Sequence, residues 1–381
     1  MKRIAIIGAG ISGLFIANLF KKNPNYHISI YEKNNSINLE EGYGIQLSVN
    51  SVNLLNKINF NRFYEEDKFH PNKIDFYSIN NSKKICELNI SDFNTKDSRY
   101  TTIKRSVLIN FLKRDLTDLI KTSHSISKLD QQNKQIKVSF ENSKTIECDY
   151  LIISDGVFSK GKSLISNNLM KPKYNNFLAI RGIISTIPDY INDNNISLFL
   201  GPNFHHVIYP VNSNKDLNFI AIMKYKLSNE DQKNYSLFNE NFFIRKILDK
   251  VSLDNDKILD NLKEVKIFPI FTSNDFYQIQ YDNIHVVGDA FFAFPPSFAQ
   301  GASQSIEGAY ELFETIKNNN ENNFFKNRVK KTKMINNRSK LNQLVFHLSN
   351  PFTVLLRNFF LKKLVKNQKF LKNYLGKIYK S

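Results

Sequence analysis

The chain has 381 residues, of which 41% are hydrophobic and 23% charged, so it is long enough for two domains or for one large domain with an insertion, and its composition excludes a disordered or collagen-like protein. Its two cysteines, Cys86 and Cys148, exclude a disulfide framework, a cysteine-based zinc site and a C-x-x-C redox centre. The net charge of +18 includes 15 lysines and arginines in residues 326–381, which contain no acid, and this leaves +3 for the first 325 residues.

The first fifty residues follow the order strand, glycine-rich turn, helix, strand and acid. Residues 4–7 form a short apolar run, which is typical of a strand buried on both faces of a parallel sheet. Residues 8–13 read Gly-Ala-Gly-Ile-Ser-Gly, and an apolar helical pattern follows to about residue 22. A second strand at 27–31 ends at Glu32. This order predicts a dinucleotide-binding βαβ unit.

Each part of this unit has a physical task. Gly8 permits the tight turn, Gly10 lets the backbone approach a pyrophosphate, and Gly13 lets helix and strand pack closely. The helix start offers free N–H groups to the phosphates. Glu32, 19 residues after Gly13, can accept hydrogen bonds from ribose hydroxyls, which suits NAD or FAD. The cofactor-binding residues predicted in this unit are Gly8, Gly10, Ile11, Ser12, Gly13, Glu32 and Lys33.

A second set of motifs lies near residue 290. Residues 283–287 read as a buried strand, and Asp289 follows it, where its carboxylate can bind a ribityl or ribose hydroxyl. After an aromatic and proline-rich loop, Gly301 and Ala302 open a helix that runs to about residue 316. The start of that helix presents N–H groups to an anionic or electron-rich ring edge.

With these segments the chain resembles the FAD-dependent aromatic hydroxylases, which are single-component flavoprotein monooxygenases that include salicylate hydroxylase and p-hydroxybenzoate hydroxylase. The resemblance extends to about residue 350. The matching segments are 42–50, Arg105 with Leu108 and Leu112, 149–159 with Asp155 in its Asp-Gly pair, Gly288-Asp289, Pro296, and Gln300-Gly301-Ala302. The resemblance implies FAD as the cofactor, bound by Arg105, Asp155, Asp289, Pro296, Gly301 and Ala302 in addition to the βαβ unit.

The order of these motifs predicts an α/β protein, α+β overall. Its Rossmann-like FAD-binding domain is discontinuous, with an inserted, mostly antiparallel β-sheet substrate domain and a C-terminal helical segment. We expect strands within the insert at 196–200, 205–211 and 217–223. The expected boundaries are 1–165 for the first FAD part, with some substrate-side strands around 40–100, then 166–275 for the substrate domain, 276–325 for the second FAD part and 326–381 for the basic helical segment.

The segment 201–211 contains the candidate catalytic side chains. In a strand, His205 and Tyr209 lie on one face and His206 on the other. The resemblance implies that His205 deprotonates a substrate phenol, that Tyr209 hydrogen-bonds a ring substituent, and that Gln300 contacts the substrate. The alternative is that His205 is only hydrogen-bonded and that His206 faces solvent. Neither these nor the other histidines have the spacing of metal ligands, so we expect no metal.

The resemblance implies a monooxygenase that uses FAD, NAD(P)H and O2 and inserts one oxygen atom into an aromatic, phenolic small molecule through a flavin C4a-hydroperoxide. The chain has no second G-x-G-x-x-G, and the resemblance implies that NAD(P)H docks transiently on the FAD domain. Phe292 and Ala293 depart from the usual His and Pro after the Gly-Asp pair, and Lys162 replaces an Arg, which leaves the nicotinamide preference open. Two alternatives remain: oxygenation of a lipophilic substrate such as a quinone precursor at a membrane surface, and a non-catalytic flavin-binding protein.

The basic segment 326–381 has apolar residues at helical spacing. One interpretation is that its apolar side packs on the FAD domain while the lysines are solvated. The other is that a basic amphipathic helix contacts an anionic membrane surface. We expect no nucleic acid as a partner, because no recognition motif accompanies the charge. The expected location is cytoplasmic, with or without peripheral contact to the inner face of a membrane, and the protein is expected to be a monomer or a homodimer. The apolar residues are Leu356, Phe359, Phe360, Leu364, Leu371, Tyr374, Leu375 and Ile378.

Overall fold

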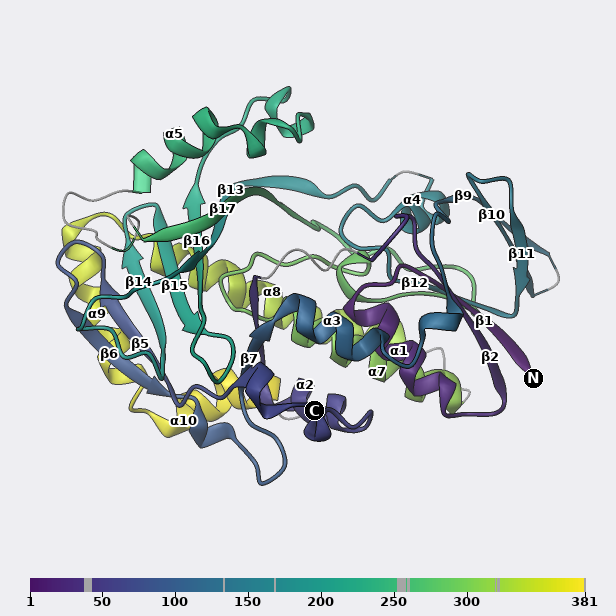
Figure 1. The fold of residues 1–381 in the computed structure, drawn as a ribbon, viewed down its shortest axis with the longest axis horizontal. Helices are drawn as coiled ribbons and strands as arrows, with labels where there is room; N and C mark the ends of the chain where they lie inside the picture. The colour runs from purple at the N-terminus through teal and green to yellow at the C-terminus, as the bar shows by residue number, and fades with distance from the viewer. Residues whose placement is uncertain are drawn as a thin grey trace.

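The computed structural model describes residues 1–37, 43–132, 134–167, 169–251, 258, 261–318, 320 and 323–379. Gly42 and Lys380 therefore lie outside the described residues. Figure 1 shows a parallel sheet with the N-terminus at one end of the molecule and a larger sheet at the other end. The C-terminal helices run along the larger sheet. This arrangement confirms the predicted fold class, whereas the predicted domain boundaries stay predictions.

Five parallel strands form the sheet that contains the N-terminal strand, in the order β18–β12–β1–β2–β8. The central strand β1 pairs with β2 on one side and with β12 on the other. Because the chain leaves β1 in one direction and later returns on its other side, a switch point lies between β1 and β12, where sheets of this kind bind ligands. The strands are β1 Lys2–Ile7, β2 Tyr26–Tyr31, β8 Ile120–Lys121, β12 Tyr150–Ile153 and β18 Ile284–Val286.

Helices cover one side of this sheet. The helix α1 is apolar almost all round, and its Leu14, Phe15 and Ile16 are fully buried, as expected for a helix packed between a sheet and other helices. It contacts α7 and α3 as well as β2. The helices on this side are α1 Ile11–Lys21, α2 Val49–Asn56, α3 Arg105–Lys113 and α7 Gly301–Lys317. Helix α4 Lys160–Ile165 packs on the other side. On the far side lies a small antiparallel sheet of β9 Ile126–Gln132, β10 Gln135–Phe140 and β11 Thr145–Cys148.

A seven-stranded sheet forms the other end of the molecule, in the order β17–β13–β16–β15–β14–β5–β6. All neighbours are antiparallel except β14 and β5. Two of its strands precede α3 in the chain, so the chain enters this sheet twice. The strands are β5 Lys73–Ser78, β6 Lys84–Asn89, β13 Lys173–Ile184, β14 Ile196–Gly201, β15 Phe204–Pro210, β16 Leu217–Lys224 and β17 Leu262–Thr272. The small sheet β3 Gly44–Leu47, β7 Thr101–Lys104 and β4 Lys68–Phe69 lies beside it.

The two faces of the seven-stranded sheet are covered by different parts of the chain. One face packs against α5 (Asn241–Val251) through a cluster that includes Phe219 and Ile208. The other face packs against the C-terminal helices through a cluster that includes Tyr209 and Leu371. These helices are α8 Phe324–Phe346, α9 Pro351–Leu364, α10 Gln368–Leu371 and α11 Lys377–Tyr379.

The interpretation that the tail packs on the FAD domain is therefore only partly right. Leu371 and Leu375 are buried, but they belong to the core of the substrate sheet. Leu356, Phe359 and Phe360 are exposed instead of packed. Among the described residues, no helix is both long and apolar enough to cross a membrane.

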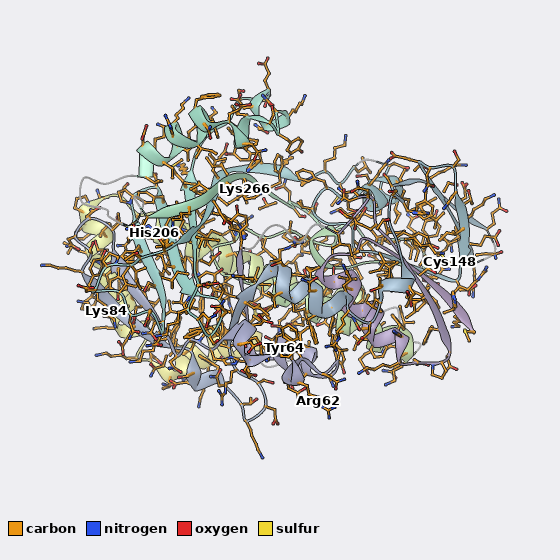
Figure 2. The ribbon with its side chains drawn as sticks, in the orientation of Figure 1. Arg62, Tyr64, Lys84, Cys148, His206 and Lys266 are labelled. Carbon is orange, nitrogen blue, oxygen red and sulfur yellow. The ribbon has the colours of Figure 1, made fainter. Side chains whose placement is uncertain are left out.

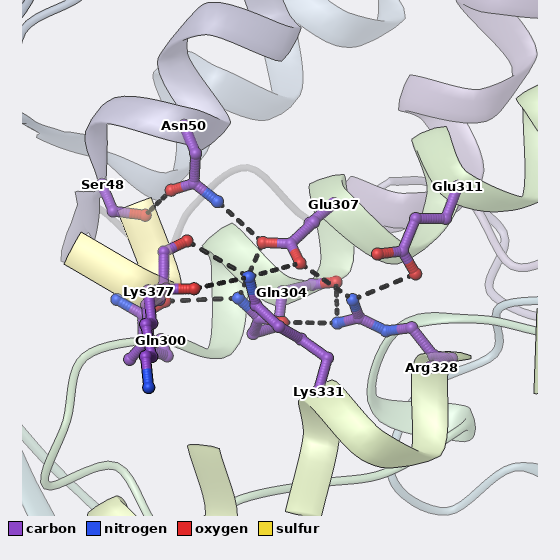
Figure 3. A network of polar contacts seen from close by, with 10 residues as sticks. Ser48, Asn50, Gln300, Gln304, Glu307, Glu311, Arg328, Lys331 and Lys377 are labelled. Carbon is purple, nitrogen blue, oxygen red and sulfur yellow. Dashed lines mark hydrogen bonds and ion pairs between the residues drawn. The ribbon is translucent and has the colours of Figure 1, made fainter. Parts of the chain in front are cut away.

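A buried polar network joins α8 to α7 (Figure 3). The guanidinium of Arg328 donates to Glu307 at 3.3 Å and to the side-chain oxygen of Gln304 at 2.5 Å. Lys331 lies 3.2 Å from the same Glu307 carboxylate and also donates to the carbonyls of Lys377 and Ile378 at 3.3 Å. The pair Glu307 and Arg328 is buried, so each charge depends on the other for its solvation.

Replacing one member of this pair should be costly. We expect Arg328→Met to lower the free energy of unfolding by about 3–5 kcal/mol, because among the described residues it leaves the buried Glu307 carboxylate with Lys331 as its one remaining ion-pair partner. The double variant Glu307→Gln/Arg328→Met should recover part of that loss, since it also removes the buried carboxylate that the single variant leaves without its arginine. Urea unfolding of the three proteins measures both effects. A single variant as stable as the wild type would contradict the assignment.

Candidate active site

The predicted cofactor motifs meet at one edge of the parallel sheet. Gly8 follows β1, Glu32 follows β2, Asp155 lies two residues beyond β12, and Asp289 lies three residues beyond β18. Because parallel strands end at the same edge, these four positions come together across four neighbouring strands. The sequence motifs, although up to 281 residues apart, thus surround one region of the structure.

The glycines of the first turn are required by close contacts. Gly8 has a φ of +100°, and a Cβ there would lie 2.6 Å from the carbonyl oxygen of Ser154. A Cβ on Gly13 would lie 2.1 Å from the carbonyl oxygen of Gly8. A Cβ on Gly10, by contrast, would meet nothing within 4 Å. Helix α1 has no side-chain cap, so its first N–H groups face this open space and can bind a phosphate.

Glu32 is held at the end of β2 by the backbone. Its carboxylate accepts hydrogen bonds from the N–H of Ala9 at 2.9 Å and of Asn34 at 3.1 Å. These two hydrogen bonds hold Glu32 beside the glycine turn, where its carboxylate can reach a ribose. Of the other residues predicted here, Ser12 is buried, Ile11 is half-buried and Lys33 is exposed.

Three charged side chains gather where β12 and β18 end. Asp289 is exposed as a residue, but the protein around its carboxylate removes much of the water from that group and raises its pKa to about 6. The positive charges of Arg105 and Lys162 act in the opposite direction and lower this pKa. Lys162 is only 7% exposed, and burial lowers its pKa despite the attraction of Asp155 and Asp289. The motif comparison treated Lys162 only as a replacement for an arginine. Its position near both aspartates was not predictable from the motif spacing.

Asp155 has an acceptor that the described part of the chain leaves unused. One carboxylate oxygen accepts a hydrogen bond from the N–H of Gly161 at 3.0 Å. The other, Oδ1, is buried and has no hydrogen-bond partner among the described residues. A buried acceptor without a donor is costly, so this oxygen fits a hydroxyl or N–H supplied by a bound molecule. Together with the open side of Gly10 and the uncapped helix α1, it fits a dinucleotide such as FAD.

The start of α7 forms the other side of this region. A Cβ on Gly301 would meet nothing within 4 Å, and no side chain caps the helix, so its first N–H groups are available to a ligand. Gln300 is buried, and its side-chain oxygen accepts a hydrogen bond from Gln304 at 3.3 Å. Pro296 and Ala302 are half-buried. Gln300 is thus connected to the buried network of α7 and α8 (Figure 3).

One row of residues near the centre of the seven-stranded sheet is not fully covered. Arg181 on β13 is paired with Ile220 on β16, which is paired with Val207 on β15. All three are half-buried, although on the opposite face of the same strands Ile208 and Phe219 are fully buried. Val207 and Ile220 pack in part against the cluster shared with the C-terminal helices, so this half-buried row is a candidate place for a small molecule on the sheet.

Tyr209 lies at the end of β15 next to the FAD part. A Cβ on Gly44 would lie 2.8 Å from the Tyr209 ring, and the N–H of Gly44 donates to Asn218 at 2.6 Å. The strand that begins at Gly44 leads to Ser48, whose N–H donates to Ser303 in the first turn of α7 at 3.0 Å. Burial raises the pKa of Tyr209, so its hydroxyl stays a hydrogen-bond donor at physiological pH.

His205 lies further along β15, about 13 Å from Tyr209 at ~3.3 Å per residue. It is buried, and its Nδ1 lies 2.7 Å from Nε2 of His347, which follows α8. Burial, with His347 and His206 nearby, lowers the pKa of His205 well below its ordinary value. Burial also lowers the pKa of His347 to about 4, so both rings are neutral at physiological pH. The sequence analysis did not identify His347 as a partner, because 142 residues separate the two histidines.

The expectation that His206 faces solvent is wrong. Its side chain is buried and stacks on Phe199, with ring centroids 4.5 Å apart, and Phe199 belongs to the cluster that packs against α5. Its Nε2 has no hydrogen-bond partner in the described part of the chain. The strand alternation was predicted correctly, but the face opposite His205 is covered by α5. Among the described residues, no group of three His, Cys, Asp or Glu side chains lies close enough to hold a metal ion.

Comparison with known proteins identifies the family. The family model described as "FAD binding domain" matches residues 1–319. The chain belongs to this FAD-binding family. FAD is therefore the dinucleotide that the βαβ unit predicts, and the expected resemblance to FAD-dependent aromatic hydroxylases is confirmed.

Relatives and solved structures extend this result. The chain is 24% identical over 229 residues to 3-amino-4-hydroxybenzoate 2-monooxygenase of Streptomyces cremeus, covering 58% of this chain and 56% of the relative. It is 24% identical to chloroplastic zeaxanthin epoxidase of an Oncidium hybrid cultivar, covering 81% of this chain and 48% of the relative. The chain thus spans about half the length of these two relatives. A substrate complex of salicylate hydroxylase has the same fold, with a TM-score of 0.77, 16% identity and coverage of 99% and 97% of the two chains.

The buried histidines make stability depend on pH. The pKa is lowered by burial in each of His205, His206, His285 and His347, to about 3 for His206 and about 4 for the last two. In the unfolded chain each takes up a proton near pH 6.5, so the stabilisation is present above pH 6.5 and is lost on acidification. We expect the free energy of unfolding to fall by up to about 1.4 kcal/mol per pH unit for each histidine.

The variant His206→Phe tests this prediction, because a phenyl ring keeps the stacking on Phe199 and removes one titrating group. We expect it to be at least as stable as the wild type at pH 7 and clearly more stable at pH 5. Urea unfolding at both pH values measures the difference. Identical pH slopes for the two proteins would show that His206 titrates normally in the folded state.

Proposed function

We propose that this protein is a monooxygenase that uses FAD, NAD(P)H and O2 to insert one oxygen atom into an aromatic, phenolic small molecule. The half-buried row of Arg181, Ile220 and Val207 carries this proposal, because it leaves a place for a flat apolar ring on the sheet between Tyr209 and His205. When bound, FAD supplies the reduction of O2 and the transfer of one oxygen atom. The chain supplies the position of the ring, a site shielded from water and a path for the phenol proton.

Different residues at the edge of the parallel sheet bind different parts of FAD. The N–H groups at the start of α1 bind the pyrophosphate, and Glu32 binds a ribose. Asp289 and Asp155 accept hydrogen bonds from hydroxyls, and Lys162 and Arg105 balance the negative charge of this region. The remaining contacts are assigned to Gly8, Gly10, Ile11, Ser12, Gly13, Lys33, Pro296, Gly301 and Ala302.

The substrate phenol is bound from the two sides of the row, along β15. Tyr209 donates a hydrogen bond to a ring substituent on the side nearer α7, and Gln300 contacts the ring from the loop before that helix. His205 accepts the phenol proton on Nε2 when its Nδ1–H donates to Nε2 of His347. Because the pKa of His205 is lowered, the ring is a weak base by itself. Passing the Nδ1 proton on to His347 moves the positive charge away from His205.

The charge at one end of the row suggests the substrate class. Arg181 lies beside the apolar pair Ile220 and Val207, with its guanidinium 5.7 Å from the centre of the Tyr43 ring. A guanidinium in this position matches a carboxylate. The relative from Streptomyces cremeus and the salicylate hydroxylase are named for hydroxylated aromatic acids. A phenol that carries a carboxylate is therefore the substrate class that we propose for this chain.

A second candidate keeps the cofactor and changes the substrate. One side of α9 is apolar and exposed, which favours a lipophilic substrate oxygenated next to a membrane. One of the relatives is named for the epoxidation of zeaxanthin. Stimulation of NAD(P)H oxidation by lipophilic compounds and not by aromatic acids distinguishes this candidate from the first. Bound FAD with no stimulation by either class supports a non-catalytic flavin-binding protein.

The central test is NAD(P)H oxidation by the FAD-loaded protein, with and without a panel of phenols and hydroxylated aromatic acids, and with products identified by mass. We expect stimulated oxidation and a product heavier by one oxygen atom. Tyr209→Phe should raise KM more than it lowers kcat, whereas His205→Asn should lower kcat by about 100-fold or more. His206→Phe, on the opposite face of the strand, is the matched control and should leave both constants unchanged. Equal losses of activity in all three variants would contradict the roles assigned to Tyr209 and His205.

Binding of FAD should depend on pH through Asp289. An ionised carboxylate accepts a hydrogen bond more strongly than a protonated one, and the pKa of Asp289 is raised to about 6. We therefore expect FAD to bind the apoprotein more weakly at pH 5 than at pH 7.5. The isosteric variant Asp289→Asn should bind FAD more weakly than the wild type at pH 7.5 and show a flatter pH dependence. Titrations followed by flavin fluorescence measure both, and a variant with the full pH dependence of the wild type would exclude Asp289 as its source.

A further inference from the structure

Helix α9 exposes its apolar side. Phe352, Leu355, Leu356, Phe359 and Phe360 recur at intervals of three and four residues, so they share one side of the helix. Each of them is between 41% and 68% exposed. When the outer side of a surface helix contacts only water, the large apolar side chains of that helix normally pack against the core. Five large apolar side chains on one side of a single helix form a patch that requires an occupant.

The packing of the helix fixes this orientation. The opposite side of α9 contacts β6, and Leu361 and Val365 pack there against the core of the substrate sheet. The same side carries Arg357, which is buried and donates to Asn358 at 3.0 Å. A rotation that buried the phenylalanines would therefore remove the packing of Leu361 and Val365. The helix begins at Pro351, and the side chain of Asn350 before it caps the helix by accepting hydrogen bonds from the N–H groups of Phe352 and Thr353.

Positive charge surrounds the apolar side of α9. The ammonium of Lys363 lies 4.3 Å from the centre of the Phe359 ring, so it is on the exposed side itself. Lys362, Lys366 and Lys369 are also exposed, and residues 326–381 contain no acidic residue. Exposed aromatic and aliphatic side chains combined with lysines are typical of a helix that lies in the interface of an anionic bilayer.

We propose that the exposed side of α9 docks on an anionic lipid bilayer. The side chains of Phe352, Leu355, Phe359 and Phe360 insert at the level of the headgroups, and Lys363 and Lys366 bind lipid phosphates. α9 lies at the β6 edge of the substrate sheet, far from the parallel sheet (Figure 1). In Figure 2, Lys84 marks β6 on this side of the molecule. This inference goes beyond the proposed reaction and does not depend on it.

The charge pattern favours a bilayer over a second copy of the chain. Two copies that paired through α9 would bring Lys363 and Lys366 of both together, and no acid in residues 326–381 could compensate them. The centres of protein interfaces are also depleted in lysine. Anionic lipids supply the complementary charge, and each lysine near such a surface adds to the attraction.

The test is co-sedimentation of the full-length, FAD-loaded protein with vesicles. We expect binding to mixed phosphatidylglycerol and phosphatidylcholine vesicles, weak binding to phosphatidylcholine alone, and loss of binding as the salt concentration rises. Phe359→Ser/Phe360→Ser should weaken partitioning by about tenfold or more, because it removes two inserted rings. Lys363→Glu/Lys366→Glu should weaken it by a similar factor on the anionic vesicles only.

Helix α5 provides matched controls, because it covers the opposite face of the same sheet. Phe242→Ser removes a phenylalanine that is 63% exposed there, and Lys246→Glu/Lys250→Glu reverses two exposed lysines. We expect both controls to bind vesicles as the wild type does, and all variants to retain FAD. The proposal is overturned if the wild type does not bind anionic vesicles, or if the α5 controls lose as much binding as the α9 variants. It is also overturned if light scattering shows a dimer that the α9 variants convert to monomer while vesicle binding stays unchanged.

Discussion

The ion pair between Glu307 and Arg328 is the constraint on which the geometry of the proposed substrate site depends. Both charges are buried, and a buried charge is tolerated only where its partner stays in contact. Glu307 lies on the helix that begins next to Gln300, while Arg328 lies near the start of α8. The pair therefore fixes α8 against α7. At the far end of α8, His347 lies within hydrogen-bond distance of His205. His347, which lies beyond the FAD motifs in the chain, thus contacts the substrate sheet.

The sequence predicted those parts of the molecule that short segments determine by themselves. The turn at Gly8 and the contact of Gly13 with the Gly8 carbonyl depend on backbone geometry within six residues, so the glycine spacing was sufficient to predict them. The alternation along β15 was also predicted, because it follows from the pleat of a strand. Asp289 was expected directly after a buried strand, and the resemblance implied that both Asp155 and Asp289 contact FAD; the structure places both beyond neighbouring parallel strands.

The parts that were missed depend on contacts between distant segments. His205 and His347 are 142 residues apart, and nothing near either residue in the chain indicates the other. His206 was expected to face solvent as an alternative, because strand alternation does not tell which face is covered by a helix. In the tail, the apolar pattern is similar around Phe359 and around Leu375, yet only the second is buried. Periodicity predicts that a helix has an apolar side, but it does not predict what that side contacts.

The position of α9 relates the charge of the tail to the substrate site. The strand β6, against which α9 packs, is three strands from β15, so Val207 lies about 14 Å from that edge at ~4.8 Å per strand. At physiological salt, charges act over about 8 Å, so the tail orients the protein only when it is already near an anionic surface. The apolar side chains then have to hold it there. In that orientation the substrate sheet faces the bilayer and the parallel sheet points away from it. The half-buried row of Arg181, Ile220 and Val207 then lies within a short distance of molecules that partition into lipid.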